Sequence, residues 1–390
     1  MFKPNQRFKL KALGINIYGG GQTLGMLKHF AVVEQWEEIA LGRRTFDLNF
    51  QGIARPICRP SEWPISKYAG KVLLVYANPP CVPFSDASSY SRRTNPDQVG
   101  RRGKTVADRL KDPLLELTES THQAALALRP QIFICESVQN AYTYGRARYE
   151  MYRDRWLKAG YSVTWLLTDA LLHGAPCRRQ RFHFLAHKVQ LALPQAPAPT
   201  RVSTVRDAIG DLVDRPLQDR LVGGPFQHWE IPTGAWNRDD RWRYLLKRVP
   251  TFGQLAAAEP PGGWPAGCPR PSTFVQRLRW DGPSGTVLRG GHKLHPGGER
   301  WVTMRELMRL TTYPDEFRAA SEIDICDSVL PCVAEFLAGV AKESIRHGDA
   351  VRSPTFSIVD WRDIAKPFHS HQEKMSCAQG QVTSAGRSGI

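Results

Sequence analysis

The sequence predicts an α/β protein built on a doubly wound parallel β-sheet. Two observations carry this prediction. Uninterrupted apolar runs, such as residues 72–76, are typical of strands that are buried on both faces, as they are in a parallel sheet. Helix-like segments alternate with these runs through the first half of the chain. This order is expected when helices cover both faces of a parallel sheet.

The individual elements follow from apolar patterning and from turn residues. Strands are predicted where short apolar or alternating runs end in turn residues, at residues 10–18, 30–36, 71–77, 130–136, 161–170 and 181–188. Helices are predicted where apolar residues recur at helical spacing, at residues 37–46, 112–129, 149–159, 303–311 and 333–345. A glycine-rich turn follows the first strand, and it is suited to a cofactor lying against the backbone or to an ordinary turn.

Composition divides the chain into four regions. Residues 1–190 carry the regular alternation and are expected to form the main domain, which a Pro/Ala-rich linker closes. Residues 191–300 are rich in Gly, Pro, Trp and Arg, which indicates a small irregular domain. Residues 301–350 return to helical patterning. Residues 351–390 are polar, and we expect a disordered tail.

Length and residue usage exclude several classes of protein. The 390 residues are 42% hydrophobic, but no apolar run approaches the roughly 20 residues that a membrane span requires. The amino terminus has no signal-peptide core, so we expect a cytoplasmic protein. The eight cysteines include no C-x-x-C pair, which argues against a zinc site or a disulfide scaffold and favours reduced thiols.

The charge balance indicates a polyanionic partner. The formal net charge is +16 and the isoelectric point is about 9.7, and such values are typical of nucleic-acid-binding proteins. A basic surface that only maintains solubility is the alternative. Clustering favours nucleic acid, because a strongly basic segment at residues 91–111 follows directly after a candidate reactive cysteine.

That cysteine stands in the stretch "NPPCVPFS", at the end of an apolar run. Pro79 and Pro80 cannot donate hydrogen bonds to a strand ladder, so the strand must end there. Cys81 is therefore expected at the carboxyl end of a parallel strand, where open α/β sheets bind their ligands. A rigid loop with an incidental cysteine is the alternative.

Three further side chains are expected near the same edge of the sheet. Glu136 ends the strand "IFICE", although an exposed loop acid has the same pattern. Arg179 and Arg181 are two residues apart at the start of a strand, so their side chains face the same way, either into one pocket or onto the surface. A thiolate, a carboxylic acid and a guanidinium together suit the covalent activation of a flat heterocycle.

With these motifs in this order, residues 14–345 resemble the cytosine-C5 DNA methyltransferase family. "NPPCVPFS" is similar to its nucleophile loop, "ESV" to its Glu-Asn-Val segment and "GAPCRRQRFHFLA" to its arginine segment. The resemblance implies a class I S-adenosylmethionine-dependent methyltransferase with a Rossmann-like sheet. It assigns Cys81 to attack on cytosine C6, Glu136 to N3, and Arg179 and Arg181 to the catalytic site, with Arg181 at O2.

The resemblance also implies a binding site for S-adenosylmethionine. Glu34 takes the place of the acid that binds the ribose hydroxyls, and Trp36 would lie beside the adenine. The full set of implied cofactor-binding residues is Tyr18, Gly20, Gly21, Glu34, Gln35, Trp36, Asn78, Pro80, Asp327, Ser328 and Val329.

The implied partner is double-stranded DNA, from which the target cytosine is flipped into the pocket. Residues 91–104 correspond to the family's mobile loop, and a solvated charge run is the alternative. Segments 204–212, 277–287 and 302–317 match the family segments that bracket its target-recognition region, which here is short and predicts low sequence specificity. We expect a monomeric, bacterial or phage-encoded enzyme of the restriction-modification type.

The departures from the family pattern gather around the cofactor. Asn16 replaces a Phe, Tyr18 and Asn78 replace Gly, Cys177 replaces Gln, and Cys326-Asp327 replaces Gly-Asn. Because of these departures, two alternative functions remain. The protein could be a catalytically silent nucleic-acid-binding relative, or a transferase that uses a modified donor or installs a different C5 group. RNA is an alternative acceptor, since one branch of the family methylates RNA.

Overall fold

The computed structural model describes residues 1–5, 7–85, 110–197, 201–231, 276–287, 293–297 and 300–368. The predicted mobile loop at residues 91–104 lies outside these residues. So does most of the segment that was expected to read the DNA sequence, at residues 232–275.

The described residues form the predicted strands and helices, with shifts of a few residues at their ends. The strands of the large sheet are β1 Lys11–Ile15, β2 Ala31–Trp36, β3 Leu74–Ala77, β4 Ile132–Val138, β5 Ser162–Asp169, β6 Gln180–His187 and β9 Phe356–Asp360. A second sheet pairs β7 Gln276–Arg277 with β8 Lys293–Leu294. The helices are α1 Gly21–Met26, α2 Arg43–Asn49, α3 Ile65–Tyr68, α5 Leu114–Leu128, α6 Arg146–Lys158, α7 Val205–Ile209, α9 Met304–Leu310, α10 Glu322–Cys326 and α11 Pro331–His347.

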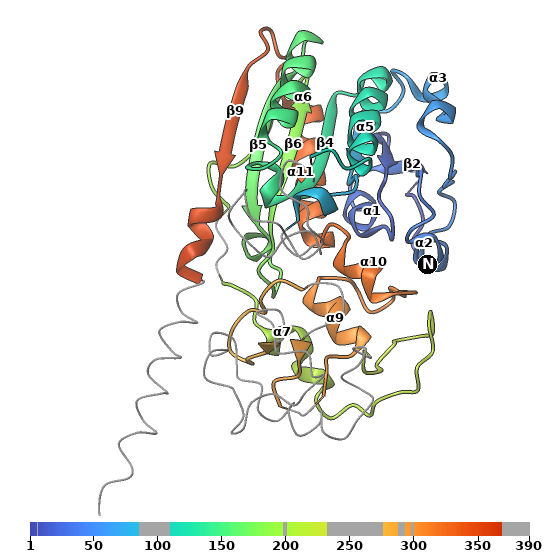
Figure 1. Cartoon of the computed structure of the whole chain (residues 1–390), viewed down its shortest axis with the longest axis vertical. Coiled ribbons are helices and arrows are strands. Elements are labelled where there is room, and N and C mark those ends of the chain that lie inside the picture. Colours follow the sequence, from blue (N-terminus) through green and yellow to red (C-terminus); the bar gives the residue numbers. More distant parts are fainter. Residues whose placement is uncertain are drawn as a thin grey trace, which may run out of the picture.

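The large sheet has the strand order β2-β1-β3-β4-β6-β5-β9 (Figure 1). All neighbouring strands are parallel except that β6 runs antiparallel to both β4 and β5. The prediction of a doubly wound α/β sheet is confirmed, and β6 is the exception to its parallel direction. Because β6 is reversed, its first residues lie at the edge of the sheet where β3 and β4 end.

Two hydrophobic clusters cover the two faces of the sheet. Alternate residues of β4 show the division, because Ile134 belongs to one cluster and Phe133 and Cys135 to the other. The first cluster includes residues of α1, α9 and α11, and α1 packs directly on α11. The second includes residues of α5 and α6. The sheet is therefore buried on both faces, as its continuous apolar runs predict.

A smaller lobe lies below the sheet in Figure 1, where α7 and α9 pack together. Both helices begin with a capping box, formed by Thr204 with Asp207 in α7 and by Thr303 with Glu306 in α9. The side chain of Arg300 also donates two hydrogen bonds to Glu306, at 2.7 and 2.8 Å. These contacts order two of the three segments that were expected to bracket the recognition region, at residues 204–212 and 302–317.

The helix predicted at residues 37–46 is wrong in its first half. Gly42 has a φ of +71° and precedes the first residue of α2, so the helix begins at Arg43. Glu37 instead leaves the end of β2 and accepts hydrogen bonds from the backbone of the glycine-rich turn. This role of Glu37 was not predicted, because the residues that follow it have a helix-like pattern.

The disordered tail expected from residue 351 is also wrong over its first part. Residues 356–360 form β9, which pairs in parallel with β5 and adds a seventh strand to the sheet. Trp361 follows it with 2% of its surface exposed and contacts the ring of Phe336. The strand was missed because it is a short edge strand with little buried surface, and it stands in a stretch that is polar on both sides.

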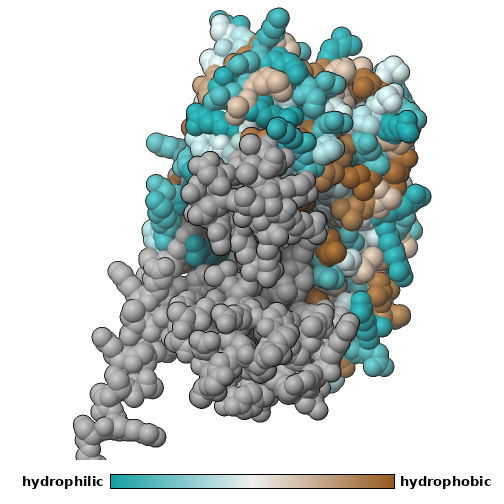
Figure 2. Space-filling view, in the orientation of Figure 1, coloured by the Kyte–Doolittle hydropathy of each residue, from teal (hydrophilic) through white to brown (hydrophobic). Residues whose placement is uncertain are grey.

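The described surface carries both hydrophilic and hydrophobic residues. Figure 2 shows hydrophilic residues over much of the coloured surface at the upper end of the molecule, with hydrophobic residues in smaller groups at its right side. No helix in the described part of the chain is long and apolar enough to cross a membrane.

Two helical glycines give opposite predictions for stability. A Cβ atom on Gly25 would lie 2.3 Å from the backbone nitrogen of Glu335, so Gly25→Ala should separate α1 from α11 and lower the free energy of unfolding by about 1–3 kcal/mol. A Cβ atom on Gly339 in α11 would have Nε2 of His29, at 3.7 Å, as its nearest described neighbour outside the helix. Gly339→Ala should therefore raise the free energy of unfolding by up to about 1 kcal/mol. Urea denaturation of both variants measures the two signs. Equal effects would contradict the proposed close packing at Gly25.

Candidate active site

The nucleophile candidate lies where β3 ends. Pro79 and Pro80 follow the last strand residues, and Cys81 then takes φ −101° and ψ 0°, in a sparsely populated backbone region that active-site residues often adopt. The carbonyl of Cys81 accepts a hydrogen bond from the backbone N–H of Phe84 at 2.9 Å, which closes one helical turn. The thiol is partly buried and lies at the carboxyl edge of the sheet.

Glu136 and Arg181 meet at the same edge from neighbouring strands. Glu136 is 2% exposed near the end of β4, and its Oε1 lies 2.8 Å from Nε of Arg181 in an ion pair. The other carboxylate oxygen accepts a hydrogen bond of 2.5 Å from the amide of Asn78. Asn78 was predicted to contact the cofactor, and its amide nitrogen also orients the candidate acid.

Burial gives Glu136 the character of a proton donor. Burial raises the pKa of the Glu136 carboxyl, and the nearby charges of Arg181 and Arg179 act in the opposite direction. The pKa of Arg181 is lowered to about 10, chiefly by burial, so this guanidinium still carries its charge at neutral pH. The pair thus combines a protonatable acid with a fixed cation.

The same charges act on the thiol of Cys81. Its pKa is raised to about 11, first by burial and then by the negative charges of Glu136 and Asp327. Arg181 and Arg179 lower it. Cys81 is therefore a thiol in the free protein at neutral pH, and it becomes a nucleophile only when its proton is removed.

Arg179 has a different role from Arg181. Its guanidinium donates hydrogen bonds to the backbone oxygens of Cys326 at 2.7 Å and Ser328 at 2.9 Å. The Ser328 hydroxyl in turn donates to the backbone oxygen of Asp324. The two arginines therefore do not act alike, because Arg179 holds the loop at residues 326–329 against the site.

That loop packs against the glycine-rich turn after β1. A Cβ atom on Gly21 would lie 2.4 Å from the backbone oxygen of Val329, so only glycine permits this approach. Asn16 and Tyr18 both have left-handed backbone conformations, with φ of 55° and 59°. The family pattern has glycine at the position of Tyr18, and the positive φ explains that preference.

The acid at the end of β2 is Glu37, three residues after the one that was predicted. One oxygen of Glu37 accepts hydrogen bonds from the backbone N–H groups of Ile17 and Tyr18, at 2.8 and 3.0 Å. Gln35, which was predicted, lies on the same side and donates to Glu37 at 2.8 Å. The end of the apolar run at Trp36 was the signal that could have identified Glu37.

Glu34 and Trp36 lie on the other side of β2. Glu34 forms an ion pair of 2.6 Å with Lys67, and it also accepts a hydrogen bond from the indole N–H of Trp36. Trp36 has no exposed surface, and its ring stacks on Trp63. The structure does not bring these two predicted residues to the glycine-rich turn.

Polar groups around the turn suit a small polar cofactor. Within the described part of the chain, both amide atoms of Gln22, Oε2 of Glu37 and Oδ1 of Asn78 are buried without a hydrogen-bond partner. These groups can accept from hydroxyl and amino groups or donate to a carboxylate. This donor and acceptor set fits the ribose and amino-acid ends of S-adenosylmethionine. Of the other predicted contacts, Pro80 is buried at the same edge, and Gly20 packs against Phe50.

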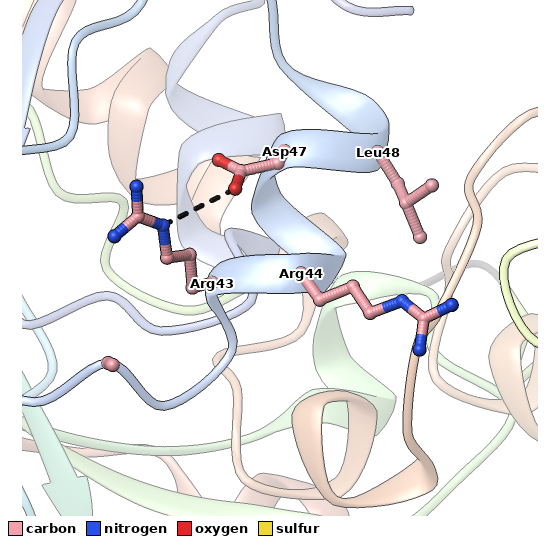
Figure 3. A pocket seen from close by; sticks show the side chains of 5 residues that line it. Arg43, Arg44, Asp47 and Leu48 are labelled. Carbon is pink, nitrogen blue, oxygen red and sulfur yellow. Dashed lines mark ion pairs between the residues drawn. The ribbon is translucent and has the colours of Figure 1, made fainter.

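A separate hollow lies on the outer surface of α2 (Figure 3). Arg43 and Asp47 form an exposed ion pair of 3.5 Å on one side of it, and Arg44 and Leu48 point away from them. Exposed pairs of this kind contribute little to stability. The catalytic candidates lie elsewhere.

The comparison with protein families agrees with this geometry. The family model "C-5 cytosine-specific DNA methylase" matches residues 18–338, which include the nucleophile candidate, the acid and both arginines. The chain belongs to the C-5 cytosine-specific DNA methylase family.

Type II methyltransferases share part of this sequence, and another methyltransferase shares its fold. The type II methyltransferase M1.HphI of Haemophilus parahaemolyticus is 26% identical over 285 residues, which cover 69% of this chain and 68% of that protein. The type II methyltransferase M.XorII of Xanthomonas oryzae is 25% identical over 278 residues, covering 61% and 64%. The methyltransferase EhMeth of Entamoeba histolytica has the same fold, with a TM-score of 0.58 at 10% identity over 87% of this chain and 99% of that one.

One departure from the methylase pattern predicts a gain of reactivity. Asp327 replaces the family's Asn, and its negative charge raises the pKa of Cys81. Asp327→Asn should lower that pKa and speed covalent capture of the target base by about threefold to tenfold. The rate of capture at fixed neutral pH measures this effect. A slower rate in Asp327→Asn would show that Asp327 assists the reaction.

Proposed function

We propose that the protein transfers a methyl group to C5 of cytosine in double-stranded DNA through a covalent adduct between Cys81 and C6. The observation that carries this proposal is the meeting of Cys81, Glu136 and Arg181 at one edge of the sheet, with Glu136 kept protonatable by burial. The target base would leave the duplex to reach them, because C6 is shielded inside the stack.

The side chains have distinct parts in the proposed reaction. The thiolate sulfur of Cys81 forms a bond to C6 while Glu136 gives its proton to N3, which moves electron density to C5. Arg181 holds the exocyclic oxygen O2 by its fixed charge. After C5 has gained the methyl group, a base removes the C5 proton, the bond from sulfur to C6 breaks, and the N3 proton returns to Glu136.

S-adenosylmethionine would supply an electrophilic methyl group on a sulfonium sulfur. Glu37 and Gln22 are placed to bind its polar ends, beside the glycine-rich turn. Arg179 would support the cofactor side of the site by holding the backbone of residues 326–328. The net charge of +16 suits a DNA backbone as the partner.

Mass spectrometry of nucleosides tests the product directly. DNA from cells that express the protein should contain 5-methylcytosine above the level in cells that express Cys81→Ser. Bisulfite sequencing of the same DNA then gives the sequence context. A product of another mass would indicate a modified donor or a different C5 group, and labelling of tRNA but not DNA with radioactive cofactor would indicate an RNA acceptor. Equal 5-methylcytosine in both cell lines would overturn the proposal.

A catalytically silent nucleic-acid-binding relative is the second candidate. The observation that favours it is the packing of the chain's own atoms on the glycine-rich turn, where Gly20 contacts Phe50 and Gly21 contacts Val329. Calorimetry with S-adenosylmethionine separates the candidates. Absence of binding at millimolar cofactor, with DNA binding retained, would establish the silent relative.

A further inference from the structure

A small cavity lies behind Glu136, on the face of the sheet that α11 covers. Glu136, Thr168, Arg181 and His183 line it from β4, β5 and β6. The apolar residues that line it are Ala170, Val329, Leu330 and Val333, and Arg179 lines it as well. None of the steps proposed above uses Thr168 or His183.

His183 is the unexplained polar group of this cavity. It pairs directly with Glu136 in the antiparallel register of β4 and β6, so the two side chains stand on the same face of the sheet as near neighbours. The imidazole has no exposed surface. Neither ring nitrogen has a hydrogen-bond partner within the described part of the chain. A buried polar group without a partner costs about 1–3 kcal/mol, so some group is expected to satisfy it.

A water molecule fits the size of the cavity. Its volume of about 10 Å³ corresponds to about one water molecule. Polar partners surround the position, namely the carboxyl group of Glu136, the ring nitrogens of His183 and the hydroxyl of Thr168. The Thr168 hydroxyl also forms a hydrogen bond of 2.7 Å with Nε2 of His173.

We propose that His183 is a positioning residue for Glu136, and that one buried water links the carboxyl group to an imidazole nitrogen. This inference rests on the proposed function. Asn78 and Arg181 both donate toward Glu136 and thereby favour its carboxylate form. Neutral imidazole has an acceptor nitrogen. A water that accepts a hydrogen bond from the protonated Glu136 carboxyl and donates one to His183 therefore favours the acid form.

Charged and titratable groups surround the water that would join Glu136 to His183. His173 and Arg181 face His183, and together with burial they keep the imidazole neutral, with its pKa lowered to about 3. Arg179 and Arg181 face Glu136. The residues of α11 that face the cavity are apolar. His183 therefore acts by hydrogen bonding and does not itself titrate between pH 5 and pH 9.

The pH profile of covalent capture tests the proposal. With limiting DNA that carries 5-fluorocytosine, the rate should rise with pH as Cys81 loses its proton and should level off where Glu136 loses its own. His183→Met removes the acceptor and should lower the pKa of Glu136. The rate should then level off at lower pH, with a plateau about tenfold lower and unchanged rates below the levelling point. His183→Gln, which keeps a polar end at similar length, should restore most of the plateau.

His187→Phe is the matched control, because His187 is a buried histidine of the same strand that contacts Thr164 and not Glu136. It should leave the levelling point where it is in wild type. A His183→Met profile that falls equally at every pH, or that matches the His183→Gln profile, would overturn the positioning role. If wild type captures no DNA at any pH, the proposed function itself fails. Thermal unfolding of each variant identifies losses that come from misfolding.

Discussion

Cys81→Ser is expected to abolish covalent capture of DNA carrying 5-fluorocytosine and to reduce methyl transfer by at least about a thousandfold. The proposed mechanism requires a thiolate that can both attack C6 and leave again. A serine hydroxyl at the same position is far more weakly acidic, and no imidazole is among the described groups that act on Cys81. A denaturing gel shows the adduct as a band of slower mobility.

The control for this experiment is Cys58→Ser, which makes the same chemical change at another partly buried thiol away from Glu136 and Arg181. It should retain full capture. Capture by Cys81→Ser at a rate near that of wild type would exclude Cys81 as the nucleophile, whatever the fate of methyl transfer.

Glu136→Gln has the second-largest expected effect, a loss of about a hundredfold to ten-thousandfold in the rate of capture. The amide keeps the shape of the side chain but cannot give a proton to N3. The pH dependence is the sharper measurement. The raised pKa of Glu136 means that the acid form persists above the usual range of a Glu and is lost as pH rises through that value.

In wild type, therefore, the gain in Cys81 thiolate with rising pH is cancelled once Glu136 ionises, and the rate levels off. In Glu136→Gln no acid is lost, so the much slower rate should continue to rise toward the Cys81 pKa of about 11. Glu136→Asp, which keeps the acid on a shorter stem, should restore the levelling. A profile of Glu136→Gln parallel to that of wild type would mean that another group supplies the proton.

Local sequence rules predicted the parts of the site that lie at strand ends. The prolines after β3 and the polar residue after the apolar run of β4 are visible without any structure, and they placed Cys81 and Glu136 at one edge of the sheet. Arg181 was predicted because side chains two apart on a strand share a face. The alternation of strand-like and helix-like segments was sufficient to predict most of the strands and helices of the large sheet and its covering layers.

The remaining features depend on contacts between distant segments. The sequence alone does not show that Asn78 orients Glu136, or that Arg179 binds the backbone at residues 326 and 328, because each contact joins segments that are far apart in the chain. Glu34 was chosen because a motif was matched by its letters, and the sequence alone does not show that β2 ends at Trp36 and brings Glu37 to the glycine-rich turn. His183 was not among the predicted residues, because its register against Glu136 cannot be read from the sequence.

The position of β9 has a consequence for how the protein is made. β9 pairs with β5, and its residues follow those of β5 by almost two hundred positions, so β5 has one unpaired edge during synthesis until residue 360 has left the ribosome. A long apolar strand with a free edge is a template for pairing with other chains. Chains that stop before β9 should therefore be more prone to aggregate than chains that include it, although their catalytic residues are intact.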